Sequence, residues 1–216
     1  MADEKKRILC YGDSNTWGYM PGTGERYSAE ERWTGRVQTL LGSAYTVLEE
    51  GLNGRTTVYE DPVNPYRNGL RGLGYALQAV KPLDMAVVCL GTNDLHFTDI
   101  RGAVRGIEQI LWTLLNANSI YQGSTPVFRT EPRVLLIAPP PLHPMVDTQR
   151  TECLLCGKVS DSLQFGTLYR KVAEQFDVPF LDAAEFGTVS EVDGVHMTVQ
   201  CHAAMAEAVS TEIQRI

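Results

Sequence analysis

The sequence has few basic residues and no long apolar run, and both shortages limit what the protein can bind. Its 216 residues include 19 Lys and Arg against 26 Asp and Glu, a net charge of −7. Nucleic acids and anionic membranes require a basic face, so neither is expected as a partner. No apolar run approaches the length of a membrane span, and no separate apolar segment precedes the first predicted strand, so no signal peptide is expected.

The cysteine pattern argues against a metal site. The five cysteines are an odd number. Cys10 and Cys89 lie in apolar runs, where cysteine acts as a small hydrophobic residue. Cys153 and Cys156 have zinc or redox spacing, but no second pair follows and no strand-to-helix context surrounds them. We therefore expect structural cysteines and a reduced, cytoplasmic protein.

A glycine-rich phosphate loop is missing after the first predicted strand, residues 8–11. Gly12-Asp13-Ser14-Asn15 follows instead, which puts a carboxylate where a phosphate would lie. The sequence therefore disfavours a nucleotide-binding domain.

What the chain does contain is a regular alternation of strand-like and helix-like segments. Apolar or β-branched runs predict strands at 8–11, 45–52, 85–90, 134–138 and 179–182. Helical spacing of apolar residues predicts helices over 30–41, 68–80, 100–115, 161–176 and 199–213. We expect residues 116–132 to form a surface loop and the irregular segment 143–157 to cover a site. The alternation predicts an α/β fold, a parallel sheet with helices on both faces, in one domain spanning residues 1–216.

Ser14 follows the first predicted strand, at the sheet edge where α/β folds place their sites. A serine on such a turn is exposed, and backbone N–H groups around it can hold an oxyanion. Taken alone, Gly12-Asp13-Ser14 is also ordinary turn chemistry, in which Asp and Ser bond to nearby backbone groups. The motif by itself therefore favours a turn over a nucleophile.

Asp193 and His196 stand three residues apart before the last predicted helix, so their side chains can meet. The carboxylate can bind one ring nitrogen and fix the tautomer, which leaves the other nitrogen to accept a proton. A helix-capping Asp with an incidental His is the alternative, and the pair alone leaves the two interpretations about even.

Gly54 and Asn93 each follow a predicted strand, so both are expected at the same sheet edge as Ser14. A backbone N–H and a side-chain amide at that edge can both donate to an oxyanion. Considered singly, each is explained as a loop residue, since Gly and Asn tolerate left-handed backbone.

Taken together, these blocks in this order resemble the SGNH hydrolases, the GDSL-type esterases and lipases. The resemblance covers nearly the whole chain and is strongest for the arylesterase/acyltransferase (perhydrolase) branch of mycobacteria. The matching segments are 12–18, 49–57, 90–94 and 193–197. One position departs from the pattern, because Asn15 stands where the family's name motif has leucine. Packing or hydrogen bonding beside Ser14 is therefore expected to differ.

The resemblance implies a three-layer α/β/α sandwich with a flavodoxin-like parallel sheet of five strands. It also implies a catalytic triad of Ser14, Asp193 and His196, with an oxyanion hole made by the backbone N–H groups of Ser14 and Gly54 and the Asn93 side chain. No metal or organic cofactor is required. The implied activity is hydrolysis of short-chain or aryl esters through an acyl-enzyme, with transfer to alcohols or peroxide, in a homo-oligomer. The implied partners are a small-molecule ester and an alcohol or water acceptor.

Trp17 and Asp13 are assigned to substrate binding on narrower grounds. Trp17, followed by Tyr19 and Met20, is close to the nucleophile and expected to line a pocket, although core packing explains an aromatic there equally well. Asp13 is expected to support the turn rather than perform chemistry.

Two alternatives stay open beside the esterase hypothesis. A carbohydrate O-acetyl esterase (deacetylase) uses the same site. A non-catalytic binding protein on the same fold is the other, and the presence of Ser14, Asp193 and His196 argues against it.

Overall fold

Five parallel strands form the centre of the computed structural model, which describes residues 4–149 and 152–215. The strand order is β2-β1-β3-β4-β5, so the chain starts beside one edge of the sheet, forms the edge strand β2, and then returns past β1 to add β3, β4 and β5. The strands are β1 (Lys6–Gly12), β2 (Tyr45–Gly51), β3 (Met85–Cys89), β4 (Val134–Ala138) and β5 (Phe180–Asp182). The predicted class and the flavodoxin-like order are confirmed.

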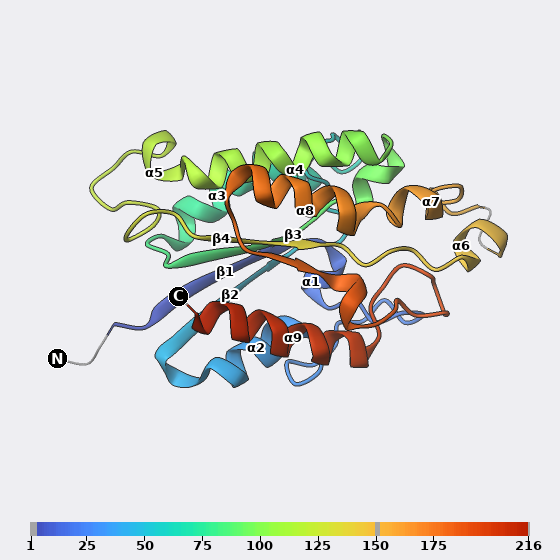
Figure 1. Ribbon diagram of the computed structural model, residues 1–216, viewed down its shortest axis with the longest axis horizontal. Coiled ribbons are helices and arrows are strands. Elements are labelled where there is room, and N and C mark those ends of the chain that lie inside the picture. Colours follow the sequence, from blue (N-terminus) through green and yellow to red (C-terminus); the bar gives the residue numbers. More distant parts are fainter. Residues whose placement is uncertain (1–3, 150–151, 216) are drawn as a thin grey trace.

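Helices cover both faces of the sheet and complete three layers (Figure 1). One layer holds α3 (Gly69–Val80), α4 (Ile100–Leu115), α5 (Ala117–Ile120) and α8 (Phe165–Phe176), and the other holds α2 (Trp33–Leu41) and α9 (Val199–Gln214). The remaining short helices are α1 (Ser14–Trp17), α6 (Met145–Thr148), α7 (Val159–Ser162), and the 3₁₀ turns η1 (Gly42–Ala44), η2 (Pro65–Arg67), η3 (Thr92–His96) and η4 (Ala183–Phe186).

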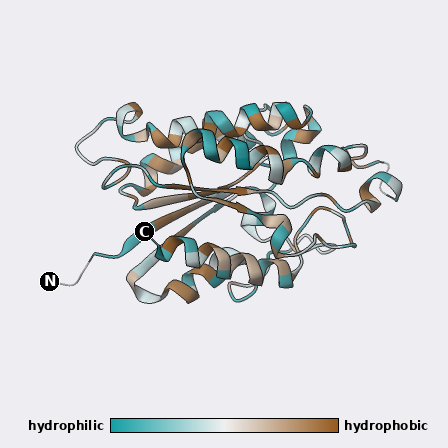
Figure 2. Cartoon of the chain, viewed as in Figure 1, coloured by the Kyte–Doolittle hydropathy of each residue, from teal (hydrophilic) through white to brown (hydrophobic). Residues whose placement is uncertain are grey.

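The core is divided by the sheet into two clusters. Successive side chains of a strand point to opposite faces, so Leu9 and Tyr11 of β1 join the cluster under α4, while Ile8 and Cys10 join the cluster under α2 and α9. Every residue of β3 and β4 is buried, as their continuous apolar runs predict. Figure 2 shows these strands and the inner sides of the helices as hydrophobic.

Two sequence predictions of local structure are wrong. Residues 116–132 are more than a surface loop, because they contain α5 and bury Val127 and Phe128. The Asn118 side chain accepts from the Phe128 N–H within this segment, and a β-bridge between Leu83 and Phe128 holds the segment against the core.

The predicted helix 161–176 is divided into α7 and α8. The predicted site-covering segment 143–157 includes residues 150 and 151, which lie outside the described part of the chain. None of the helices among the described residues is long and apolar enough to cross a membrane.

Candidate active site

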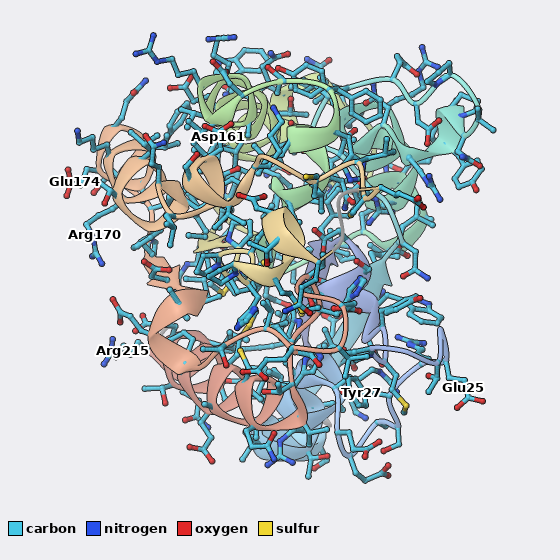
Figure 3. All side chains as sticks on the ribbon, turned by 90° about the vertical axis from the view of Figure 1, so that its right-hand side faces the viewer. Glu25, Tyr27, Asp161, Arg170, Glu174 and Arg215 are labelled. Atoms are coloured by element: carbon cyan, nitrogen blue, oxygen red, sulfur yellow. The ribbon has the colours of Figure 1, made fainter. Side chains whose placement is uncertain are left out.

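The residues singled out from the sequence meet at the carboxyl edge of the sheet. Ser14 begins α1 directly after β1, Gly54 lies in the turn after β2, and Asn93 lies in η3 after β3. Asp193 and His196 lie in the segment between η4 and α9. This edge is on the right of Figure 1 and faces the viewer in Figure 3. Glu25 and Tyr27, from the segment that follows α1, mark its lower right in Figure 3.

The turn that presents Ser14 depends on close backbone contacts. Asp13 caps α1, because its Oδ1 accepts a hydrogen bond from the Asn15 backbone N–H at 2.9 Å. A Cβ on Gly51, the last residue of β2, would lie 2.2 Å from the Trp17 backbone nitrogen. Only glycine lets β2 pass this close to α1. The sequence therefore fixes the position of the Ser14 turn against the sheet.

Ser14, His196 and Asp193 form a continuous chain of hydrogen bonds. His196 Nδ1 lies 2.8 Å from Asp193 Oδ2, and His196 Nε2 lies 2.9 Å from Ser14 Oγ. An ionised carboxylate can only accept, so Nδ1 carries the proton and donates to Asp193. Nε2 is then the acceptor for the Ser14 hydroxyl. This arrangement equips His196 to remove the Ser14 proton.

Asp193 is held in its ionised form. Burial opposes ionisation, but hydrogen bonds from the His196 ring and from the backbone N–H groups of Val195 and His196 outweigh it, so the pKa of Asp193 is lowered. Asp193 thus keeps its charge beside the imidazole across the neutral range.

Asn93 and Gly54 lie beside Ser14 with hydrogens able to donate. The Asn93 amide donates one hydrogen to the Arg55 carbonyl at 3.1 Å, which fixes the amide and leaves its second hydrogen for a ligand. Gly54 has a positive φ of 79°, a backbone conformation that glycine adopts without strain. Both residues and Ser14 line one cavity of about 490 Å³.

Two buried carboxyl groups, those of Asp13 and Asp94, form hydrogen bonds with the loops that carry the site residues. Burial raises the pKa of Asp13 to about 6 and that of Asp94 to about 7. Asp94 accepts hydrogen bonds from the backbone N–H and the hydroxyl of Thr57, which ties η3 to the segment after Gly54. Both groups therefore hold loops in place.

Neither of the two predicted substrate-binding residues, Trp17 and Asp13, is among the described residues that line the cavity. Tyr19 does line it. The Tyr19 ring stacks on His196 with 4.1 Å between ring centroids. Trp17 instead packs against the Arg26 guanidinium, 5.4 Å from its ring centroid. The geometry thus favours Tyr19 over Trp17 as the aromatic wall.

Sequence reasoning missed several polar residues of the cavity lining, among them Asn53, Arg67 and His96. Cys153 and Leu155 also line the cavity, and both belong to the segment 143–157 that the sequence predicts to cover a site. Arg67 precedes α3 and pairs with Asp61 at 2.8 Å. No local sequence pattern indicates Asn53, Arg67 or His96, because only the tertiary fold brings them to the carboxyl edge of the sheet. In the described residues, no group of three or more His, Cys, Asp or Glu is placed to hold a metal ion.

Comparison with known sequences gives one family. Residues 10–204 match the GDSL-like lipase/acylhydrolase family. The comparison with curated proteins gives no match.

Solved structures of similar proteins cover almost the entire chain. The aryl esterase of M. smegmatis is 32% identical with a TM-score of 0.88, covering 97% of this chain and 99% of that chain. A carbohydrate acetylesterase from Sinorhizobium meliloti is 31% identical with a TM-score of 0.89, covering 98% and 99% respectively. A G-D-S-L family member from Veillonella parvula, at 15% identity, a TM-score of 0.67 and coverage of 98% and 100%, shares the fold.

Proposed function

The chain belongs to the GDSL-like lipase/acylhydrolase family, and on that premise we propose that it is a serine esterase acting on short-chain or aryl carboxylic esters. The observation that carries the proposal is the hydrogen-bond chain from Asp193 through His196 to Ser14, at 2.8 and 2.9 Å. An ester hydrolase needs such a nucleophile, base and orienting carboxylate in contact.

The mechanism has two steps that share one base. Ser14 Oγ attacks the ester carbonyl while His196 Nε2 takes its proton. The resulting oxyanion accepts hydrogen bonds from the backbone N–H groups of Ser14 and Gly54 and from the Asn93 amide. His196 then protonates the leaving alcohol, and an acyl-serine remains. Water, activated by His196, attacks the acyl-serine and releases the acid and Ser14.

Ser14→Ala tests the proposal. It should remove nearly all hydrolysis of p-nitrophenyl acetate and all labelling by a fluorophosphonate, with the fold kept. Ser210→Ala is the control, because Ser210 is buried in α9 outside the cavity lining. If Ser14→Ala keeps activity within about tenfold of the wild type, a loss of only about 1.4 kcal/mol, Ser14 is not the nucleophile.

Acyl transfer is the finer part of the proposal. Its support is the similarity to the mycobacterial branch and the apolar groups that Tyr19, Leu155 and Val192 contribute to the cavity lining. Each buried CH₂ contributes about 0.8 kcal/mol, so a butyl chain can favour an alcohol over water by up to about a hundredfold. Peroxide, which is small, gains nothing from these contacts. An activated acetate ester supplied with a primary alcohol should yield a new ester, and formation of acid alone refutes transfer.

Carbohydrate O-acetyl ester hydrolysis is the second candidate. The cavity lining includes Asn53, Arg67 and His96, which offer hydrogen-bonding groups to a sugar, and a similar structure is a carbohydrate acetylesterase. Comparing kcat/KM on aryl acetate with kcat/KM on an acetylated oligosaccharide separates the two candidates.

Assembly and location complete the proposal. We expect a homo-oligomer with contacts through residues 20–32 and 119–133, and light scattering that gives a 23.9 kDa monomer at micromolar concentration would refute it. The cysteines of the described chain are all free, which supports a cytoplasmic location.

A further inference from the structure

We infer that Asn15 is a positioning residue, which holds His196 at hydrogen-bonding distance from Ser14. The inference rests on the proposed function. It starts from a side chain that lies directly after Ser14 in sequence yet bonds to residues 180 and 182 positions away. Asn15 is only 2% exposed, so its amide needs partners within the protein.

The Asn15 amide brackets His196 on both sides. Its Oδ1 accepts from the Met197 backbone N–H at 2.9 Å, and its Nδ2 donates to the Val195 carbonyl at 3.4 Å. A side-chain amide has the same donor and acceptor as a peptide group. Asn15 therefore pairs with the backbone around His196 as a neighbouring strand would. Figure 1 shows α1 close to the orange segment that leads into α9.

The backbone–backbone bonds of this segment lead to parts of the chain other than the Ser14 turn. The His196 carbonyl accepts from Ser190 N–H and its own N–H donates to Asp193, which holds the segment to itself. The Gly194 carbonyl accepts from the His143 N–H, and the His196 ring stacks on Tyr19. Asn15 connects it to the turn that carries the nucleophile. Because the Asn15 backbone N–H is also bound by Asp13, one residue fixes both the Ser14 turn and the His196 segment.

Leucine at this position, as the family's name motif has it, would preserve the branched shape and lose both bonds. The Met197 N–H and Val195 carbonyl would then lack their partner, and the segment could shift relative to Ser14. A displacement near 1 Å costs about a hundredfold in rate. Asn15→Leu should therefore lower kcat for p-nitrophenyl acetate by about 10- to 100-fold, with KM nearly unchanged.

Asn118 provides a matched control in the same chain. Its amide makes the same kind of two-sided bridge, accepting from Phe128 N–H at 2.8 Å and donating to the Phe128 carbonyl at 3.0 Å. It lies in α5, outside the cavity lining. Asn118→Leu should lower stability and leave kcat unchanged, so any general loss of packing is measured separately.

The experiment compares both variants with the wild type at a temperature where circular dichroism shows each folded. A kcat of Asn15→Leu within about threefold of that of Asn118→Leu overturns the inference, as does a loss confined to KM. If Asn15→Leu fails to fold, Asn15→Asp is compared with Asn118→Asp. Asn15→Asp keeps the acceptor for Met197 and loses the donor to Val195, so an unchanged kcat again overturns the inference.

A second readout is independent of turnover. The nitrogen NMR signal of His196 Nε2, assigned by its loss in His196→Asn, reports the hydrogen bond between Nε2 and Ser14 Oγ. The chemical shift of this signal should be unchanged in Asn118→Leu and should move toward its value in Ser14→Ala in Asn15→Leu. If it is unchanged in Asn15→Leu, Asn15 does not position His196. If it changes while the wild type hydrolyses no ester, the positioning is upheld and only the proposed esterase function fails.

Discussion

Replacing Asn93 by alanine tests the proposed oxyanion hole, the part of the proposed mechanism that bears most directly on the transition state. The proposal assigns three donors to it, the Ser14 and Gly54 N–H groups and the Asn93 amide. The Asn93 amide donates one hydrogen to the Arg55 carbonyl at 3.1 Å, so only its second amide hydrogen can bind the oxyanion. Removing one oxyanion donor costs roughly 10²–10³ in kcat, about 2.7–4 kcal/mol.

The expected result is a fall of that size in kcat with KM changed little, because the bond strengthens as charge develops on the oxygen. Loss of the Arg55 bond should also lower the free energy of unfolding by about 1 kcal/mol, which a denaturant titration measures. Asn93→Asp is the shape-matched companion, since a carboxylate cannot donate and should lose at least as much. Steady-state kinetics in which the loss falls entirely on KM would refute the reasoning and make Asn93 a substrate-binding residue.

Two buried titratable groups give further predictions, with opposite pH dependence. Burial lowers the pKa of His202 to about 3 from an ordinary 6.5, so its contribution to stability is present above pH 6.5 and is lost as the pH falls toward 3. His202→Asn keeps an acceptor for the Trp33 backbone N–H. In urea titrations it should remove most of this fall in the free energy of unfolding, which is on the order of 5 kcal/mol. Burial raises the pKa of Asp94 to about 7, so its contribution is present below pH 4 and is lost as the pH rises through 7. Asp94→Asn should remove that loss, and an unchanged stability profile between pH 4 and 8 would contradict the assignment.

The sequence predicted much of the fold because its signals are local. The run Met85–Cys89 is apolar throughout, which is typical of a strand covered on both faces, and the structure buries every residue of β3. Helix α4 has the predicted bounds, since its apolar spacing and the capping Asp99 both lie in the sequence. The prediction of a surface loop over 116–132 is wrong because Val127 and Phe128 stand among turn residues in the sequence. Contact with distant residues buries them.

Within the site, the sequence alone determined the chemical groups, and the tertiary structure decided which of them meet. Ser14 and Asn93 could be named because parallel strands deliver their ends to one edge, and His196 could be named because it follows Asp193 by three residues. The sequence did not predict the stack of Tyr19 on His196 or the presence of Arg67 in the cavity lining. It also did not predict the Asn15 bridge to Val195 and Met197. Periodicity reports which face a residue occupies, a property of a few neighbouring residues. Contacts between residues some 180 positions apart depend on how the four crossovers between the five strands pack around the sheet, and only the folded chain fixes that.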